Sequence, residues 1–388
     1  MTASDFERQA RIDVLGKGFD CLLLTPSFAR GGAERAQVNL ANALHKDGLR
    51  VGVLGLTSDG PLRADLSKGV VVGDLGSERA LSAILPLSRL LGKARPRIVI
   101  SALDHLNVLA IVANHLAGRP TQVAVVCHRH ISSTIRLSSL WRERHLMAPA
   151  IWMTYRAADH VVALTQAMAS DLARVAGLPE DRIKVLPNVM TVEETNEPAE
   201  LHPWLLQSAV PVLVGMGRLD PQKNFHLTVK AVERVATLRD VKLLIYGEGP
   251  LRQALQNEID ARGLSGNAEL VGLTSSPIKV LSHADAFVLS SDYEGLPMVL
   301  VEALSAGCPV IATDCPTGPA EILGGGRFGK LVDMGDDAEL ATAIIETLDA
   351  TRNPDALKVA AARYAPATVV PAYRAALDIL GQTRNSER

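Results

Sequence analysis

The chain has 388 residues, enough for two domains of ordinary size, and 47% of its residues are hydrophobic. Its 40 Lys and Arg residues nearly balance 42 Asp and Glu residues, so the formal net charge of -2 disfavours a general nucleic-acid-binding surface. High apolar content combined with low net charge also argues against disorder. No apolar run reaches the roughly 18 residues that a membrane-spanning helix needs.

The four cysteines are scattered along the chain without a C-x-x-C pair, which argues against a zinc site. Each lies in or beside an apolar run, so we expect four buried, reduced thiols: Cys21, Cys127, Cys308 and Cys315. Reduced thiols indicate a reducing compartment, and the charged N-terminal residues do not resemble a signal peptide. The expected location is the cytoplasm, with peripheral attachment to the inner membrane face left open.

Short apolar runs rich in Val, Leu and Ile alternate with helical segments, which predicts doubly wound α/β domains with parallel strands. In the first half, a helix over 33–44 accompanies the runs 19–25, 50–56, 70–75, 97–101, 122–127, 160–165 and 183–186. In the second half, helices over 227–238, 250–262 and 299–306 accompany the runs 211–217, 241–246, 268–272, 285–290, 308–313 and 329–332.

An acidic, proline-bearing segment with little apolar content separates the two halves and is typical of a linker. We therefore predict a first Rossmann-like domain over 1–190, a linker over 191–205 and a second Rossmann-like domain over 206–365. The last residues, 366–388, are predicted to form a C-terminal helix that returns to the first domain.

Sequence patterns for phosphate and cofactor binding narrow the chemistry. The sequence G-K-[ST] does not occur, so no phosphate-binding P-loop is indicated. G-x-G-x-x-G occurs at 324–329, but it stands directly before an apolar run instead of between a strand and a helix, so it does not support a nicotinamide cofactor. No D-x-D occurs, so no carboxylate pair is indicated for a metal–nucleotide complex. We expect neither a metal site nor a cofactor.

The first motif that carries chemistry is Gly31-Gly32-Ala33-Glu34, which follows the first predicted strand and opens a helix. Two glycines allow the backbone to approach a ligand closely. A helix N-terminus presents free amides and a partial positive charge to an anion. The motif therefore favours a bound phosphate group, with a tight turn that binds nothing as the alternative.

The second motif places Arg218 and Lys223 in a loop directly after the first strand of the second half. Open α/β sheets bind ligands at the carboxyl ends of their strands. A guanidinium and an ammonium there could together neutralise a diphosphate leaving group. Two solvated loop cations are the alternative.

The third motif is a pair of glutamates, Glu294 and Glu302, separated by a Gly-Leu-Pro turn and the start of a predicted helix. Glu302 stands in an otherwise apolar run, 298–304. A carboxylate in such surroundings needs hydrogen-bond partners, which sugar hydroxyls can supply. The alternative is a carboxylate that stabilises the helix dipole, followed by a surface glutamate.

These motifs, in this order over residues 19–380, resemble the large family of retaining nucleotide-sugar glycosyltransferases with the GT-B fold, in which two Rossmann-like domains face each other across a cleft. The resemblance rests on residues 31–34, 158–159 (A-D), 186–188 (L-P-N), 217–223, 247–250 (G-E-G-P) and 294–302. The segment T-D-C-P-T-G-P-A-E-I at 313–322 resembles a subset that builds lipid-linked and surface polysaccharides.

The resemblance implies a role for each matching residue of the second domain. Arg218 and Lys223 would bind the donor diphosphate, Glu302 the ribose hydroxyls, and Glu294 the donor sugar. Backbone amides beside the sugar would come from Gly295 and Leu296.

The same resemblance implies that Gly31 and Gly32 face the phosphates from the first domain. Gly247 and Val271 would border the pocket for the nucleotide base.

A histidine after a middle strand of the first domain commonly contacts the donor sugar in this family. Here the strand 122–127 is followed by His128-Arg129-His130, so two histidines stand where the family pattern has one. We expect His128, which is nearer the strand end, to make the contact, and His130 is the alternative. The predicted catalytic set is then His128, Glu294, Arg218 and Lys223.

The segment 129–156 is basic and partly apolar, with five Arg and one Glu interleaved with Trp141, Trp152 and Tyr155. A segment of this composition is typical of a surface that touches anionic lipid. An ordinary helix pair with a solvated basic face is the alternative.

We therefore predict a metal-independent, retaining hexosyltransferase. It would move a hexosyl unit from a nucleotide diphosphate sugar, with UDP favoured by resemblance, to a hydroxyl of a lipid-linked or surface glycan. Two alternatives remain: a nucleotide-sugar 2-epimerase on the same scaffold, which would need no acceptor, and a non-catalytic protein that binds nucleotide sugars.

Overall fold

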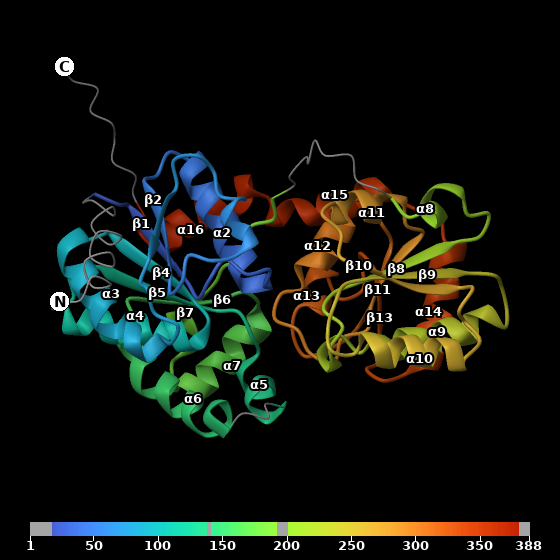
Figure 1. The fold of residues 1–388 in the computed structure, drawn as a ribbon, viewed down its shortest axis with the longest axis horizontal. Helices are drawn as coiled ribbons and strands as arrows, with labels where there is room; N and C mark the ends of the chain where they lie inside the picture. Colours follow the sequence, from blue (N-terminus) through green and yellow to red (C-terminus); the bar gives the residue numbers. More distant parts are fainter. Residues whose placement is uncertain (1–17, 138–140, 192–200, 380–388) are drawn as a thin grey trace, which may run out of the picture. The chain divides into compact units, whose positions relative to one another are not determined.

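The computed structural model describes residues 18–137, 141–191 and 201–379 (Figure 1). The described residues divide into two compact units. One contains those up to Thr191 together with those from Pro366 onward, and the other contains those in between, up to Ala365.

The first unit is built on a parallel sheet of seven strands in the order β3-β2-β1-β4-β5-β6-β7. The side chains of β1, β2 and β4 are buried along their whole length, which explains why these strands read as continuous apolar runs. The strands are β1 (Cys21–Thr25), β2 (Val51–Gly55), β3 (Val71–Asp74), β4 (Ile98–Ala102), β5 (Gln122–Cys127), β6 (His160–Ala163) and β7 (Ile183–Val185).

The helices of the first unit cover both faces of this sheet. They are α2 (Gly32–Lys46), α3 (Ala80–Ala94), α4 (Asp104–Leu116), α5 (Ile131–Leu137), α6 (Trp141–Thr154), α7 (Gln166–Ala176) and α16 (Pro366–Ala376), with 3-10 turns η1 (Pro61–Arg63), η2 (Tyr155–Ala157) and η3 (Glu180–Arg182). Figure 1 shows α16, in red, beside α2, in blue. An ion pair between Arg374 and Asp47 and a hydrogen bond from Lys184 to the carbonyl of Ala376 hold this last helix in the first unit.

The second unit has a parallel sheet of six strands in the order β10-β9-β8-β11-β12-β13. These are β8 (Val212–Met216), β9 (Lys242–Tyr246), β10 (Ala268–Gly272), β11 (Ala286–Leu289), β12 (Val310–Thr313) and β13 (Lys330–Val332). In Figure 1, α9 (Phe225–Ala236), α10 (Arg252–Ala261) and α14 (Asp337–Asp349) lie on one face, and α11 (Pro277–His283), α12 (Met298–Ser305) and α15 (Pro354–Ala361) on the other. The short elements are α8 (Pro203–Gln207), α13 (Pro319–Ile322), η4 (Pro221–Lys223) and η5 (Ala362–Tyr364).

The predicted fold class is confirmed: both sheets are parallel, and each has the crossover order of a Rossmann-like domain. Residues 203–205, at the end of the predicted linker, belong to α8, and Leu205 is buried. A proline at the first position starts this helix with a suitable φ angle. Residues 192–200 of the same prediction lie outside the described residues, as do residues 380–388 of the predicted C-terminal helix.

All four cysteines are buried and free of disulfides. Within the described ranges, every helix is too short or too polar to cross a bilayer.

Candidate functional site

The loops at the carboxyl edge of the second sheet collect most of the predicted donor-site residues. The strand order reverses between β8 and β11, and ligands of open α/β sheets bind at such a switch point. The loop after β8 carries Arg218 and Lys223, and the loop after β11 carries Glu294.

Hydrogen bonds join these two loops to each other. Gln222 Nε2 donates to the carbonyl of Tyr293 at 2.9 Å, and Asn224 Nδ2 donates to Asp292 Oδ1 at 2.8 Å. The Asp220 side chain caps η4 by accepting a bond from the backbone amide of Lys223 at 3.2 Å. The two loops therefore form one connected structure, which fixes where the Lys223 side chain begins.

Lys223 and Glu294 form a direct ion pair, with 2.5 Å between Nζ and Oε1. Their side chains are only 16% and 7% exposed. The buried hydroxyl of Ser291 donates to the same oxygen at 2.6 Å, and Thr317 Oγ1 donates to the backbone carbonyl of Glu294. Within the described part of the chain, Glu294 Oε2 has no hydrogen-bond partner, so this oxygen is available to a ligand.

Arg218 differs from Lys223 in being exposed to solvent. Its side chain is 73% exposed, and its closest ion-pair partner is Asp220, with 3.9 Å between Nε and Oδ2. A contact at that distance in solvent contributes little. The guanidinium is therefore available to an anion that approaches this edge of the sheet.

The glycines of the G-E-G-P turn allow it to pack against the Arg218 loop. Gly247 has φ of 148°, and a Cβ added there would lie 1.8 Å from the carbonyl oxygen of Gly217. A Cβ on Gly249 would lie 2.3 Å from the carbonyl oxygen of Leu219. These positions need glycine for close backbone packing, which supports the loop that carries Arg218.

The remaining predicted residues of the second unit surround the same edge. Gly295 and Leu296 precede Pro297, the N-cap of α12, and Glu302 is a partly exposed residue one turn into that helix. Gly318 has φ of 94°, and a Cβ there would meet the carbonyl oxygen of Gly295 at 2.8 Å. The T-G-P turn therefore packs on the Glu294 turn. Val271 lies near the end of β10.

In the first unit, Gly31 is the N-cap of α2 and Gly32 is its first residue. Neither has a positive φ angle. The Glu34 carboxylate folds back over Gly31, where an added Cβ would lie 2.1 Å from Glu34 Oε2. Burial raises the pKa of this carboxyl. A carboxylate of the chain itself thus lies at the helix N-terminus that the sequence assigned to a phosphate.

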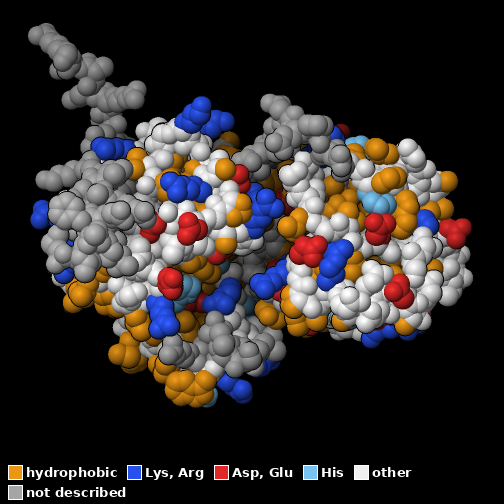
Figure 2. All heavy atoms as spheres, viewed as in Figure 1, with side chains coloured by type: hydrophobic (Ala, Val, Ile, Leu, Met, Phe, Trp, Pro, Cys, Tyr) orange, Lys and Arg blue, Asp and Glu red, His pale blue; other side chains and the backbone are white. Residues whose placement is uncertain are grey.

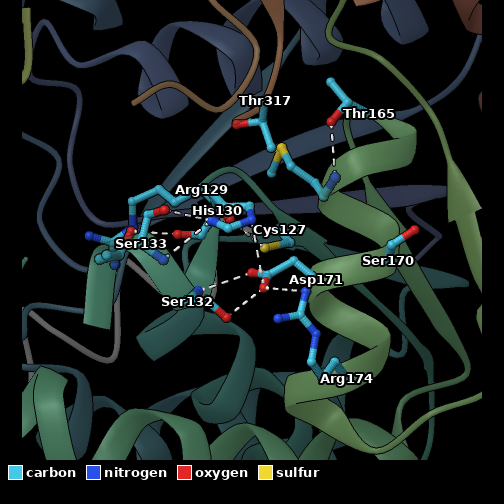
Figure 3. Close-up of polar contacts among 12 residues, drawn as sticks. Cys127, Arg129, His130, Ser132, Ser133, Thr165, Ser170, Asp171, Arg174 and Thr317 are labelled. Carbon is cyan, nitrogen blue, oxygen red and sulfur yellow. Dashed lines mark hydrogen bonds and ion pairs between the residues drawn. The ribbon is translucent and has the colours of Figure 1, made fainter. Parts of the chain in front are cut away.

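His130 is engaged in local structure. Its Nδ1 accepts a bond from the backbone amide of Ser133 at 3.2 Å and lies 2.8 Å from Ser133 Oγ, while Nε2 lies 3.6 Å from Asp171 Oδ1. Asp171 is buried and accepts two bonds from Ser132 (Figure 3). The Ser-His-Asp composition resembles that of a nucleophilic triad. The contacts are those of a helix cap, however, since His130 and Asp171 both accept bonds from amides in the first turn of α5.

His128 directly follows β5 and does not form cap contacts like those of His130. Its ring is half-buried, and Nε2 is enclosed without a hydrogen-bond partner. Burial, together with the charge of Arg129, lowers the pKa of His128 from its ordinary 6.5 to about 4. At neutral pH the imidazole is therefore uncharged, and one ring nitrogen carries a proton while the other can accept one.

Sequence reasoning did not single out Ser291, Thr317 or Asp171. Ser291 belongs to the polar run S-S-D immediately after β11, and Thr317 to the T-D-C-P-T-G segment after β12. Hydroxyls at strand ends next to a predicted catalytic carboxylate are a signal that could have identified both.

Two family models match the chain: glycosyl transferases group 1 over residues 199–364, and glycosyltransferase family 4 over residues 30–194. The lipopolysaccharide core biosynthesis glycosyltransferase LpsD of Rhizobium meliloti is 30% identical over 314 residues, which are 81% of this chain and 84% of that protein. An uncharacterized glycosyltransferase of Methanocaldococcus jannaschii is 36% identical over 174 residues, or 44% of this chain. The match spans only 43% of that relative's own length.

Among solved structures, HepE of Anabaena in complex with UDP shares the fold with a TM-score of 0.75 at 19% identity, covering 93% of this chain and 100% of that one. The two models together match both units, and the relative from Rhizobium meliloti matches most of the chain. The chain therefore belongs to the group 1 glycosyltransferases with the GT-B fold.

Proposed function

We propose that this protein transfers a hexosyl unit from a nucleotide diphosphate sugar to a hydroxyl of a lipid-linked or surface glycan. The observation that carries the proposal is the buried Lys223–Glu294 pair beside the exposed Arg218, at the switch point of the second sheet. UDP is the favoured nucleotide, supported by the UDP bound to HepE. A surface glycan acceptor is supported by the name of the lipopolysaccharide core relative.

The proposed mechanism assigns the residues of the second unit to positioning and charge stabilisation. Arg218 closes onto the diphosphate, and Lys223 adds a second positive charge while it holds Glu294 Oε1. Glu294 Oε2 then accepts a hydrogen bond from a hydroxyl of the donor sugar. Glu302 binds the ribose hydroxyls.

The bond between the anomeric carbon and the phosphate oxygen breaks as the acceptor oxygen forms its bond on the same face. The acceptor proton passes to the departing phosphate, so configuration is retained without a side-chain nucleophile. Because two cationic side chains stabilise the leaving group, we propose that no metal is needed. The family match favours transfer over the 2-epimerase and the non-catalytic alternatives.

A thermal-shift screen against a panel of nucleotide sugars tests the donor. A ligand at 100 times its Kd should stabilise the folded protein by about 2.7 kcal/mol. Arg218→Ala should lower turnover by about 10²–10³-fold with little change in Tm, because the side chain is exposed. Arg239→Ala, which removes a partly exposed arginine just after α9 that pairs with Asp349 at 2.7 Å, is the control for the loss of a positive charge. Wild-type turnover in Arg218→Ala would remove the diphosphate assignment.

We also propose that the protein works in the cytoplasm and docks on anionic membrane through α6. This helix exposes Trp141 (64%), Leu146 (50%), Trp152 (49%) and Met153 (71%). The Arg156 guanidinium stacks on Trp152 at 4.4 Å, a pairing suited to a headgroup region. Figure 2 shows hydrophobic side chains gathered on the first unit where Figure 1 places α6.

Vesicle flotation tests this surface. The protein should float with vesicles that contain phosphatidylglycerol but not with phosphatidylcholine alone, and less so at high salt. Trp152→Ser with Met153→Ser should abolish flotation. Leu238→Ser, which removes a comparably exposed side chain from the second unit, should not. Equal flotation of the two variants would exclude α6 as the contact.

A further inference from the structure

A small hollow in the first unit brings two unsatisfied polar side chains together. It is lined by Gln37 of α2, His128, Asn188 and Tyr373 of α16, among other residues, and it leaves no room for a water molecule. Gln37 is 2% exposed on the buried face of α2, where the neighbouring buried residues are almost all apolar. Its Oε1 atom and the Nε2 atom of His128 are both enclosed, and neither has a hydrogen-bond partner.

An enclosed polar atom without a partner costs about 1–3 kcal/mol, so native structures rarely leave one. Water cannot satisfy these two atoms, because the hollow does not admit it. They are complementary, however: a neutral imidazole carries one N–H donor, and an amide oxygen is an acceptor. Asn188 and Tyr373 line the same hollow, but neither has an enclosed polar atom without a partner.

We propose that Gln37 is the positioning residue of His128: its amide oxygen accepts a hydrogen bond from Nε2–H across this hollow and fixes the imidazole in that tautomer. The proton then resides on Nε2, and Nδ1, the nitrogen that is not enclosed, keeps its lone pair at the carboxyl edge of the sheet. Resting on the proposed function, we assign that lone pair to a hydroxyl of the donor sugar.

The fixed tautomer has a chemical consequence. With Nε2 protonated, Nδ1 can only accept, so His128 recognises a group that donates, such as a sugar hydroxyl. With the proton on Nδ1, the same ring would present a donor and would favour a phosphate or carbonyl oxygen instead. Gln37 therefore decides which kind of ligand atom His128 can bind.

The inference is tested by determining the tautomer of His128, a measurement that needs no substrate. In protein labelled with 15N-histidine, the His128 signals, assigned by their loss in His128→Asn, should show the proton on Nε2 at neutral pH. Gln37→Leu keeps the side-chain volume but removes the acceptor, so the tautomers should become mixed. Tyr373→Phe, which changes another residue that lines the hollow, should leave the tautomer unchanged.

Activity gives the second measurement. Gln37→Leu should reduce kcat/KM by about tenfold, the cost of one misoriented hydrogen bond, while leaving the Kd for free UDP unchanged. A wild-type proton on Nδ1, or an unchanged tautomer in Gln37→Leu, would overturn the inference. If Gln37→Leu does not fold, the wild-type spectrum still shows which ring nitrogen of His128 carries the proton, and so tests the inference. Absence of turnover with every nucleotide sugar would refute the proposed function and leave the tautomer result standing.

Discussion

The low pKa of His128 predicts a specific loss of stability in mild acid. The folded pKa is about 4 and the unfolded one 6.5, so between these values the unfolded chain binds more protons than the folded chain. The free energy of unfolding therefore falls as the pH falls from 6.5 towards 4. Above pH 6.5 the histidine is neutral in both states and makes no pH-dependent contribution.

The size of the effect follows from the two pKa values. At pH 5 the pH lies about 1.5 units below the pKa of the unfolded histidine, which is mostly protonated, whereas the folded histidine is still mostly neutral. This difference in protonation lowers the free energy of unfolding by about 2 kcal/mol. His128→Asn removes the titrating group. We expect the wild type to lose about 2 kcal/mol more than this variant between pH 7.5 and pH 5.

Urea unfolding at the two pH values measures this difference, because any cost of the substitution that does not depend on pH cancels. His145→Asn, which changes an exposed histidine on α6, is the control and should behave as the wild type does. If the loss of unfolding free energy between the two pH values differs by less than about 0.5 kcal/mol between the wild type and His128→Asn, the conclusion that His128 is enclosed and neutral is wrong.

Four further predictions concern the second unit. Lys223→Met should lower the free energy of unfolding, measured with urea, by about 3–5 kcal/mol, because it leaves Glu294 buried without its partner. The double variant Lys223→Met with Glu294→Leu should lose less than Lys223→Met alone. If the effects of the two single substitutions simply add in the double variant, the two residues are not coupled. Calorimetry should show that Glu302→Ala weakens binding of UDP and of the intact donor alike, whereas Glu294→Gln weakens the donor more; the reverse pattern would exchange their roles. Turnover should persist after exhaustive chelation, and a loss that magnesium or manganese restores would contradict metal independence. Gly247→Ala should cost about 2 kcal/mol or more because its Cβ meets the Gly217 carbonyl, whereas Gly266→Ala has open space and should be nearly neutral; equal Tm values would refute this packing argument.

The fold could be predicted because both sheets are covered on both faces. A strand such as β1, with every side chain buried, must be apolar throughout, and turn residues must separate it from the next helix. That pattern is local, so it can be read from one stretch of sequence. The short helix α8 could not be predicted in this way, because it has five residues, of which only Leu205 is buried.

The site could be predicted only as a set of positions. The pairing of Lys223 with Glu294 joins residues 71 positions apart and depends on the hydrogen bonds between their two loops. The choice between His128 and His130 depends on Asp171, which lies on another helix. Motif spacing gives no account of such contacts, because they arise only once the strands stand side by side.

In the second unit, the ammonium group of Lys223 is already paired with the Glu294 carboxylate, whereas the exposed Arg218 lies 3.9 Å from Asp220. A phosphate that binds at Lys223 must therefore compete with the Glu294 carboxylate, and its net gain is the difference between the two interactions. A single monovalent anion gains little from such an exchange. A diphosphate carries more charge and therefore binds Lys223 more strongly, and the attached sugar offers hydroxyls that can hydrogen-bond to the displaced Glu294 carboxylate. The pairing of Lys223 with Glu294 thus favours an intact nucleotide diphosphate sugar over free inorganic anions, although no residue is dedicated to excluding such anions.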